Sequence, residues 1–341
     1  MATPTMNRPT PERIFNTLAA FQQTAALKTA IELDIFTAIG DGANQAATLA
    51  KKVGAAERGV RILADYLTIQ GFLTKEGDRY SLTQESTLFL SRKSPASMTS
   101  LTGFLAGDWH KGNFEQLTKA VRKGGLVTGE GDNTKPHDEV WVAFARSMAP
   151  LTAPAAGFMA QLAGMAEQKP CKILDVAASH GMFGITFAKM NPQAQIVAVD
   201  WPAVLEVGKE NAKKAGVADR FTALPGSAFK VKLSTGYDFV LLTNILHHFD
   251  RPACEKLLKR MHAALKPGGK AITLDFVPNE DRVSPPTAAA FSLIMLAGTN
   301  VGDVYTLSEY EKMFRAAGFR KTTLHQVPDS PQQVLVTEKA E

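Results

Sequence analysis

The chain has few cysteines and no long apolar run. Two cysteines in 341 residues, Cys171 and Cys254, are too few for a disulfide framework and lack the spacing of a metal site, so we interpret both as core thiols. No stretch approaches the roughly 20 consecutive apolar residues of a membrane span, and the first residues lack the layout of a signal peptide. We therefore expect a cytoplasmic protein with no metal and no membrane partner.

The sequence also lacks a strong charge of one sign. The formal net charge is +5, from 38 Lys and Arg against 33 Asp and Glu, and no basic block is dense enough to follow a phosphate backbone. The charge gives only weak support for binding to nucleic acid, and we expect no nucleic-acid partner. What the chain does have is 45% hydrophobic residues over a length that suits two domains, each with its own core.

The spacing of apolar residues changes part-way along the chain, which predicts a domain boundary. Helical spacing extends over 12–38, and two further short helices are expected over 46–53 and 58–70. The next residues alternate around a Gly-Asp turn as a hairpin, and three helices followed by a hairpin are typical of a winged helix. We assign 1–97 to this α-helical winged-helix domain and 98–165 to a helical connector.

The remaining residues, 166–341, alternate strands with helices. This order predicts an α/β fold with a parallel, doubly wound, Rossmann-like sheet. Its last two strands, 322–327 and 332–338, are separated only by the turn Pro-Asp-Ser-Pro. They must be antiparallel, because a parallel pair needs a long crossover. A Rossmann-like sheet that ends in an antiparallel hairpin is an unusual arrangement and narrows the fold class considerably.

A nucleotide site is expected in the loops after the first two strands of this sheet, since ligands of open α/β sheets bind beyond the carboxyl ends of the strands. The first loop runs from Asp175 through Ala177 and Ser179 to Gly181, and such small residues let the backbone approach a ligand closely. The second strand ends at Asp200, whose carboxylate is suited to accept hydrogen bonds from both hydroxyls of a ribose.

This first loop resembles that of the class I S-adenosylmethionine-dependent methyltransferases, in which an acid is followed by alternating glycines. Ala177 and Ser179 stand where glycines are usual, and only Gly181 is retained. Because Ala and Ser are the smallest substitutes, we expect S-adenosylmethionine still to fit. A nicotinamide dinucleotide is a weaker candidate, because its pyrophosphate requires glycines that the loop lacks. A tight turn without a ligand is the remaining alternative.

The resemblance implies further contacts with S-adenosylmethionine. The third strand runs into a segment that in the family lies beside the adenine and commonly carries an acid. Ser227 replaces that acid here, either as an acceptor for the adenine amine or as an ordinary turn serine. The full set of expected cofactor contacts is Asp175, Ala177, Ser179, Gly181, Asp200, Trp201, Ser227, Ala228, Phe229 and Asn244.

Two adjacent histidines, His247 and His248, follow the fourth strand, where a substrate would meet the cofactor. Metal binding would need further Cys, His or Glu ligands, which the neighbouring sequence does not supply. A purely structural role at the strand end stays open. A neutral imidazole can also accept a proton at cytoplasmic pH, and general-base assistance is typically worth roughly 10²–10⁴ in rate.

Over nearly its full length the chain resembles the plant-type small-molecule O-methyltransferases and their bacterial relatives, which join a winged-helix dimerisation domain to this catalytic fold. In that family a His after the fourth strand deprotonates the acceptor hydroxyl and is usually followed by Asp-Trp. The match implies His247 as the base, with His248 and Phe249 in the Asp and Trp positions. It also implies Asp275 as the acid that orients the base.

A second acid of the family is not matched, because Val304 stands in its place with Asp303 beside it. The family also covers the acceptor with a helix that here contains Phe291 and Met295, although such a stripe equally fits a plain core. Aromatic and methionine walls suit a planar apolar acceptor. The expected acceptor contacts are Trp109, His110, Phe144, Met148, His248, Phe291, Met295 and Asp303.

We therefore expect an S-adenosylmethionine-dependent O-methyltransferase that acts on a phenolic or enolic hydroxyl of a small molecule. Its parts are a dimerisation domain (1–97), a connector that contributes to the acceptor pocket (98–165) and a cofactor-binding catalytic domain (166–341). We expect a homodimer, because the helix over 12–38 and the winged unit have more apolar positions than a small lone domain could bury.

Two alternatives stay open. One is transfer to carbon, nitrogen or sulfur on the same fold. The other is a DNA-binding or ligand-sensing regulator, whose winged unit would expose phosphate and base contacts. In the helix of that unit over 57–70, Arg58 and Arg61 are accompanied by Glu57 and Asp65. This mixture of charges suits a packing helix better than a DNA-binding helix. A nucleic-acid methyltransferase would need a basic groove, which the sequence does not indicate.

Overall fold

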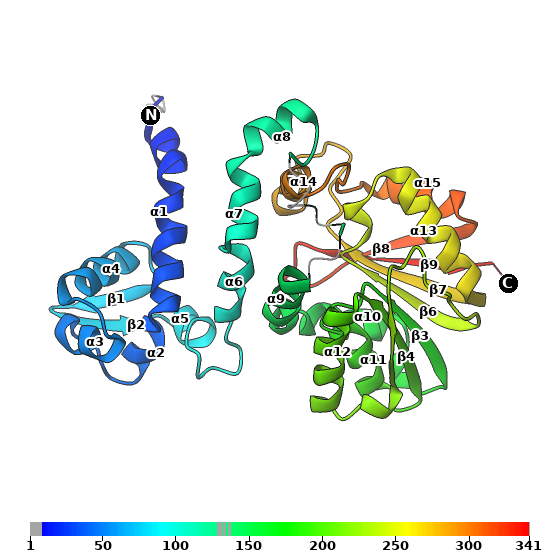
Figure 1. Ribbon diagram of the computed structural model, residues 1–341, viewed down its shortest axis with the longest axis horizontal. Helices are drawn as coiled ribbons and strands as arrows, with labels where there is room; N and C mark the ends of the chain where they lie inside the picture. Colours follow the sequence, from blue (N-terminus) through cyan, green and yellow to red (C-terminus); the bar gives the residue numbers. More distant parts are fainter. Residues whose placement is uncertain (1–8, 128–131, 133, 136–137, 341) are drawn as a thin grey trace, which may run out of the picture. The chain divides into compact units, whose positions relative to one another are not determined.

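Two units of the chain each enclose a core of their own. In this computed structural model, which describes residues 9–127, 132, 134–135 and 138–340, the contacts divide the chain into Met1–Ala106 and Gly107–Glu341. Figure 1 shows the helices and strands of each unit. The three-part division at residues 97 and 165 rests on the sequence pattern and stays a prediction.

The first unit combines helices with a two-stranded hairpin. Its elements in chain order are α1 (Glu12–Glu32), α2 (Ile35–Gly40), α3 (Ala46–Val53), α4 (Glu57–Ile69), β1 (Leu73–Glu76), β2 (Arg79–Leu82), α5 (Gln84–Phe89), η1 (Thr99–Leu101) and α6 (Thr102–Leu105). β1 and β2 are antiparallel, as their alternating pattern predicts, and Gly77 in the turn has a φ of 59°. The ring of Tyr80 is buried in the core of the unit, and its hydroxyl donates to Asp65 at 2.7 Å.

The single helix predicted over 12–38 is wrong, because two helices occupy this segment. α1 ends at Glu32 and α2 begins at Ile35. Asp34 between them has a φ of 59°, a left-handed conformation that ends a helical ladder and that Asp tolerates better than most residues. The change of direction buries Ile35 and Phe36 in the core.

The second unit begins with helices and continues as alternating strands and helices. Its helical start comprises α7 (Asp108–Glu115), α8 (Leu117–Lys123), α9 (Asp138–Met148), η3 (Ala149–Leu151), α10 (Ala153–Leu162) and η4 (Met165–Glu167). The alternating part comprises β3 (Cys171–Val176), α11 (Met182–Met190), β4 (Ala194–Asp200), α12 (Pro202–Lys214), η5 (Ala218–Arg220), β5 (Phe221–Pro225), β6 (Tyr237–Thr243), η6 (Leu246–His248), α13 (Arg251–Ala264), β7 (Leu265–Asp275), α14 (Pro286–Gly298), α15 (Leu307–Ala316), β8 (Phe319–Gln326) and β9 (Gln333–Lys339).

Within the described residues, seven strands of this unit form one sheet in the order β5-β4-β3-β6-β7-β9-β8. The first five strands in this order pair in parallel. β9 pairs antiparallel with both β7 and β8. The Rossmann-like fold with an antiparallel end is therefore confirmed, and the carboxyl ends of β3, β4, β6 and β7 lie along one edge.

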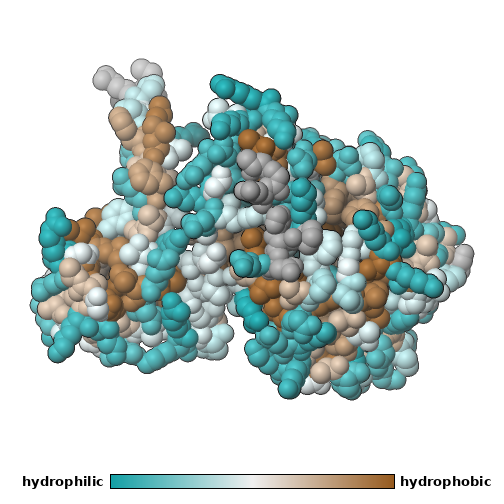
Figure 2. All heavy atoms as spheres, in the orientation of Figure 1, coloured by the Kyte–Doolittle hydropathy of each residue, from teal (hydrophilic) through white to brown (hydrophobic). Residues whose placement is uncertain are grey.

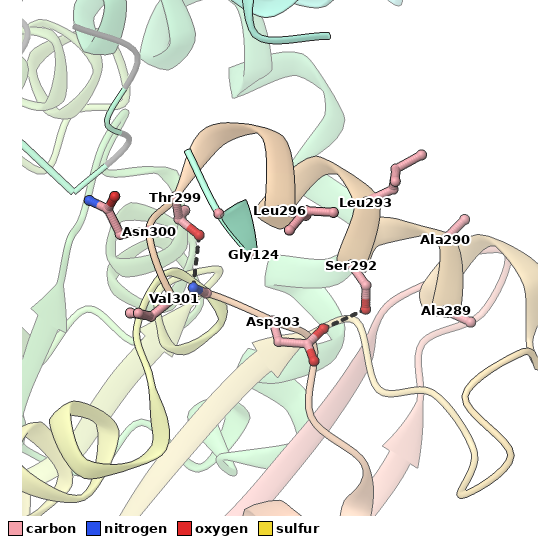
Figure 3. Close-up of a pocket in the computed structure, with 12 residues that line it drawn as sticks. Gly124, Ala289, Ala290, Ser292, Leu293, Leu296, Thr299, Asn300, Val301 and Asp303 are labelled. Atoms are coloured by element: carbon pink, nitrogen blue, oxygen red, sulfur yellow. Dashed lines mark hydrogen bonds between the residues drawn. The ribbon is translucent and has the colours of Figure 1, made fainter. Parts of the chain in front are cut away.

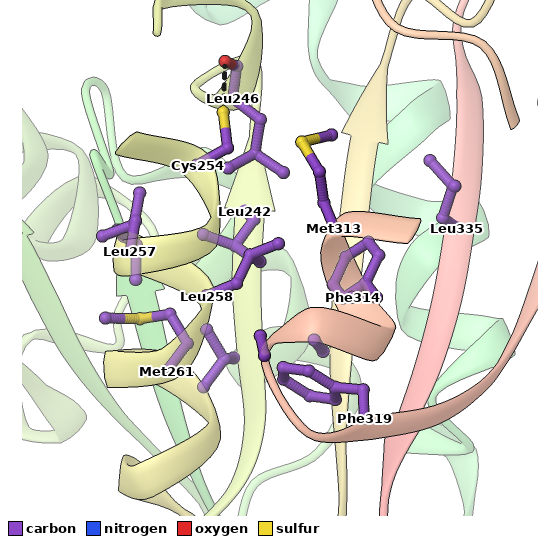
Figure 4. Packing of buried hydrophobic residues seen from close by; sticks show 14 of the residues in the cluster. Leu242, Leu246, Cys254, Leu257, Leu258, Met261, Met313, Phe314, Phe319 and Leu335 are labelled. Carbon is purple, nitrogen blue, oxygen red and sulfur yellow. Dashed lines mark hydrogen bonds between the residues drawn. The ribbon is translucent and has the colours of Figure 1, made fainter. Parts of the chain in front are cut away.

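Helices cover both faces of this sheet (Figure 1). On one face α13 and α15 pack against residues such as Leu242 and Leu335, and Figure 4 shows Leu258 and Phe314 in this layer. On the other face α10 and α11 pack against Ile173, Leu241 and neighbouring strand residues. Because adjacent strand residues point to opposite faces, the continuous apolar runs of the sequence supply both layers. Among the described residues, no helix has the length and apolarity needed to cross a membrane.

The packing of α11 on β3 predicts a sharp effect of one methyl group. A Cβ at Gly184 would lie 2.9 Å from Ile196 Cγ2 and 3.0 Å from Asp175 Oδ2. Gly184→Ala should therefore destabilise the protein by about 1–3 kcal/mol through overpacking, measured by denaturant unfolding. Gly157→Ala in α10 is the matched control, since a Cβ there meets nothing within 4 Å and a helical Gly-to-Ala change should stabilise. A Gly184→Ala protein as stable as the wild type would contradict this packing.

Candidate active site

The loop after β3 holds two residues in a strained conformation. Ala177 and Ser179 have φ values of 54° and 51°, in the left-handed region that glycine adopts without penalty. This explains why glycines are usual at these two places in the resembled family. Gly181 has a φ of 72°, and a Cβ there would also lie 3.2 Å from the Phe221 ring. Strain of this kind persists at functional loops that the surrounding structure holds in place.

Two carboxylates hold this loop from the strand ends. Asp175 is fully buried, and its Oδ2 accepts a hydrogen bond from the Gly184 amide at 3.0 Å. Asp200 accepts from the amides of Ser179 and Trp201, both at 2.7 Å. Burial raises the pKa of Asp175 to about 7, and the charge of Asp200 adds to this. Burial likewise raises the pKa of Asp200 to about 6.

One polar atom at the end of β3 and one in this loop have unused hydrogen-bonding capacity. Asp175 Oδ1 and Ser179 Oγ are buried and have no hydrogen-bond partner among the described residues. Buried polar atoms are normally paired, so these two atoms indicate where the amine or hydroxyl groups of a cofactor would complete the hydrogen bonding. The donors and acceptors present therefore fit S-adenosylmethionine, which carries an ammonium group and two ribose hydroxyls.

His180 in the same loop was not singled out from the sequence. Its Nδ1 accepts a hydrogen bond from the Met182 amide at 3.1 Å, so its Nε2 carries the proton and donates to Thr152 Oγ1 at 3.0 Å. Burial lowers the pKa of this imidazole to about 4, which keeps it neutral. His180 therefore ties the cofactor loop to the start of α10, and only the fold brings these two segments together.

The other predicted cofactor contacts lie around the same edge. Trp201 precedes α12 and packs against a small cluster that includes Ala145 of α9. Ser227 Oγ accepts from the Phe229 amide at 3.3 Å, which is the turn role that the sequence left open. Ala228 and Phe229 pack against the core under α13. Asn244 has a φ of 54°, and its Oδ1 accepts from the side chain of Gln332.

His247 and Asp275 meet at the carboxyl edge of the sheet. η6 follows β6 and carries His247, which is 2% exposed, while Asp275 ends β7 and is fully buried. The distance between His247 Nδ1 and Asp275 Oδ1 is 2.6 Å. A carboxylate can only accept, so Nδ1 carries the proton, and a second proton could bind only at Nε2. The predicted contact between His247 and Asp275 is therefore present, while the role of His247 as a base stays a prediction.

His248 lies in different surroundings from its neighbour. Its Nδ1 is buried without a hydrogen-bond partner among the described residues. Burial, together with the adjacent His247, holds the pKa of His248 well below its usual value, so it is neutral. Its ring stands edge-on to Trp141 of α9, with centroids 6.2 Å apart. The described residues contain no cluster of three or more His, Cys, Asp or Glu that could hold a metal ion.

Aromatic rings surround the His247 side chain. Phe291 of α14 lies with its ring centroid 5.0 Å from that of His247 and stacks on Phe276 at 4.0 Å. Met295 follows one turn later and is buried. On α9, Trp141 meets the ring of Phe144 edge-on at 5.6 Å. Sequence reasoning missed Trp141, although its helical spacing from Phe144 and Met148 is a signal that could have found it.

The remaining acceptor candidates lie on α7 and in the loop after α14. Trp109 and His110 are on α7, which packs against α14, and burial lowers the pKa of His110. Asp303 is engaged by other side chains: Ser292 donates to its Oδ1 at 2.6 Å, and Arg282 Nη1 lies 3.3 Å from its Oδ2. Asp303 therefore has a structural role in addition to the contact with the acceptor that we predict.

Asp303 also lines a cavity of about 540 Å³ beside α14, shown in Figure 3. The walls combine Leu293 and Leu296 with polar groups of Ser292 and Asn300. Gly302 in the same wall packs against the histidine segment, since a Cβ there would lie 2.4 Å from the carbonyl oxygen of His247. The loop after α14 therefore packs directly against the backbone of His247.

Comparisons with known proteins agree with this geometry. Residues 159–320 match the O-methyltransferase domain, and residues 15–92 match the O-methyltransferase dimerisation domain. The crystal structure of a candidate O-methyltransferase from Nostoc punctiforme is 48% identical, covers 98% of this chain and 100% of that chain, and has a TM-score of 0.93.

Two further matches are more distant. The 3-hydroxy-5-methyl-1-naphthoate 3-O-methyltransferase of Streptomyces sahachiroi is 28% identical over 87% of this chain and 86% of that protein. Human N-acetylserotonin methyltransferase, solved in complex with S-adenosylmethionine, is 21% identical over 98% of this chain and 99% of that chain, with a TM-score of 0.85, and shares the fold. The chain therefore belongs to the S-adenosylmethionine-dependent O-methyltransferase family, in which a dimerisation domain precedes the O-methyltransferase domain.

Proposed function

We propose that this chain transfers the methyl group of S-adenosylmethionine to a phenolic or enolic hydroxyl of a small planar acceptor, with His247 as the general base. The observation that carries the proposal is the buried 2.6 Å contact between His247 Nδ1 and Asp275 Oδ1 beside the cofactor loop. The Streptomyces sahachiroi relative acts on a hydroxynaphthoate, which is a planar phenolic acceptor. The regulatory alternative is not favoured by the family match.

The protein contributes proton transfer, orientation and exclusion of water. Bound S-adenosylmethionine supplies a methyl group on a positively charged sulfur. His247 Nε2 takes the acceptor proton, and Asp275 holds the Nδ1 proton and stabilises the imidazolium that forms. The rings of Phe291, Phe276 and Trp141 exclude water, and a held acceptor gains from orientation. Asp200 accepts from the ribose hydroxyls in this proposal, while Asp175 and Ser179 bind the remaining polar groups.

Beyond the acceptor, the partner that we propose is a second copy of this chain. The dimerisation domain over 15–92 indicates association with a second copy, and α1 offers a surface for it. Ile14, Phe15, Leu18 and Phe21 of α1 are 62–71% exposed, and Figure 2 shows hydrophobic residues along this helix. We propose a homodimer that buries them. The absence of a nucleic-acid partner and the cytoplasmic location stay predictions.

The α1 surface leads to a prediction about assembly. Ile14, Leu18 and Phe21 lie on one face by helical spacing, so Leu18→Glu combined with Phe21→Glu should place two charges in the interface and convert dimers to monomers in light scattering. Gln23→Glu lies on the opposite side of α1 and should leave the dimer intact. A wild-type protein that is monomeric across the micromolar range would remove the basis for this proposal.

Asp200 leads to a prediction about cofactor affinity and pH. Its pKa of about 6 in the free protein means that it carries a proton in about half of the molecules at pH 6. Both oxygens accept from the ribose hydroxyls in the ionised form, whereas the protonated form has one oxygen occupied by its proton, so binding favours the ionised form and releases this proton. The dissociation constant for the cofactor should be independent of the Asp200 titration above its pKa. Below pH 6 it should rise by up to about tenfold per pH unit. Calorimetric titration between pH 5 and 8 measures this.

Variants separate the two carboxylates in that experiment. Asp200→Asn should remove the dependence centred near pH 6, and any dependence that remains is assigned to Asp175, whose pKa is raised to about 7. Asp200→Ala should weaken binding at every pH. Undiminished affinity in Asp200→Ala would show that this carboxylate does not hold the ribose.

The histidine pair provides a matched test of the base. His247→Ala should lower kcat by roughly 10²–10⁴ with the cofactor dissociation constant unchanged. His248→Ala should have a much smaller effect, because His248 Nδ1 faces no carboxylate in the described residues. Should both variants keep near-normal turnover, orientation alone drives transfer and the acceptor is already ionised or carbon-centred.

A further inference from the structure

A buried tyrosine contacts the acid behind the proposed base. Tyr310 of α15 is fully buried in the core layer that α13 and α15 form on one face of the sheet. Its hydroxyl donates to Asp275 Oδ2 at 2.8 Å. Burial and the charge of Asp275 hold the pKa of Tyr310 well above its usual value, so the phenol keeps its proton and remains a donor throughout the working pH range.

Asp275 thereby receives hydrogen bonds on both oxygens. Its Oδ1 faces His247 Nδ1 at 2.6 Å and accepts from the Phe276 amide at 2.8 Å, while Oδ2 faces Tyr310. Hydrogen bonds to a carboxylate favour its ionised form and fix its plane. Without the Tyr310 donor, Oδ2 would be a buried acceptor with no partner, which is an unfavourable state for a charged group.

The resembled family places a second acid where this chain has Val304, which is fully buried. Among the described residues, Asp275 is the carboxylate in contact with His247. The orientation of the His247 ring therefore depends on how firmly this single, short acidic side chain is held. Tyr310 is the side chain that holds its far oxygen.

We propose that Tyr310 is a positioning residue for methyl transfer, whose hydroxyl fixes the Asp275 carboxylate in the orientation that directs His247 Nε2 toward the acceptor hydroxyl. The inference rests on the proposed role of His247 as the base. In the proton transfer, the acceptor O–H bond breaks and a bond to Nε2 forms, while the protons of His247 Nδ1 and Tyr310 stay in place. Tyr310 acts only through the other two side chains.

The test compares two tyrosines of the same core layer. Tyr310→Phe should lower kcat roughly tenfold, with KM for the acceptor and the cofactor dissociation constant unchanged, because one hydrogen bond to a charged group is lost. Tyr305→Phe is the matched control: its hydroxyl donates to the Phe249 carbonyl at 2.6 Å, and its ring lies 5.9 Å from that of Tyr310. It should lose a similar amount of stability and keep near wild-type kcat.

A double-mutant cycle distinguishes positioning from packing. In a His247→Ala background, Tyr310→Phe should have no further effect on kcat, because its influence passes through His247. An equal fall of kcat in both backgrounds, or wild-type kcat in the folded single variant, would overturn the proposal. If His247→Ala itself keeps normal turnover, the base assignment fails and this inference fails with it. If only Tyr310→Phe keeps normal kcat, the base assignment stands.

Discussion

Carboxylates buried at the carboxyl edge of the parallel sheet constrain the rest of the structure, because a buried charge needs hydrogen-bond donors close by. Asp200 and Asp275 end β4 and β7, and Asp175 is the last residue but one of β3. Asp275 faces donors on both oxygens, from a histidine, a tyrosine and a backbone amide. Asp175 has an oxygen with no partner among the described residues. The carboxylate behind the proposed base therefore has donors on both oxygens, whereas Asp175 beside the proposed cofactor site has a donor on one oxygen.

This difference matches the tasks that the two sides would perform. A carboxylate that orients a base must hold one geometry through every turnover, so internal donors serve it best. A carboxyl that binds a cofactor gains from leaving part of its hydrogen-bonding capacity to the ligand. The raised pKa values of Asp175 and Asp200, about 7 and about 6, reflect the cost of burying them before that ligand arrives.

Periodicity predicted the Rossmann-like order and the antiparallel end because these follow from local patterns and loop lengths. The pairing of His247 with Asp275 came from the family resemblance, and the geometry agrees with it. Tyr310, Trp141 and His180 were missed, because their importance depends on contacts across the fold: Tyr310 lies 35 residues from Asp275, and His180 lies 28 residues from Thr152. The break at Asp34 was missed because apolar spacing continues through a change of direction.

The helix α15 joins two parts of the site through adjacent side chains. Tyr310 holds Asp275, and Glu309 binds Arg282 Nη2 with both carboxylate oxygens at 2.7 Å. Arg282 in turn lies 3.3 Å from Asp303, which accepts from Ser292 of α14.

The preceding residue of α14, Phe291, lies beside His247. Through Tyr310, α15 therefore holds the acid behind the proposed base, and through Glu309 and Arg282 it is linked to α14. Because Glu309 also caps α15 by accepting from the Thr306 amide at 2.9 Å, fraying of this helix end would loosen both supports together. If His247 is the base and Phe291 contacts the acceptor, their spacing then depends on the stability of α15.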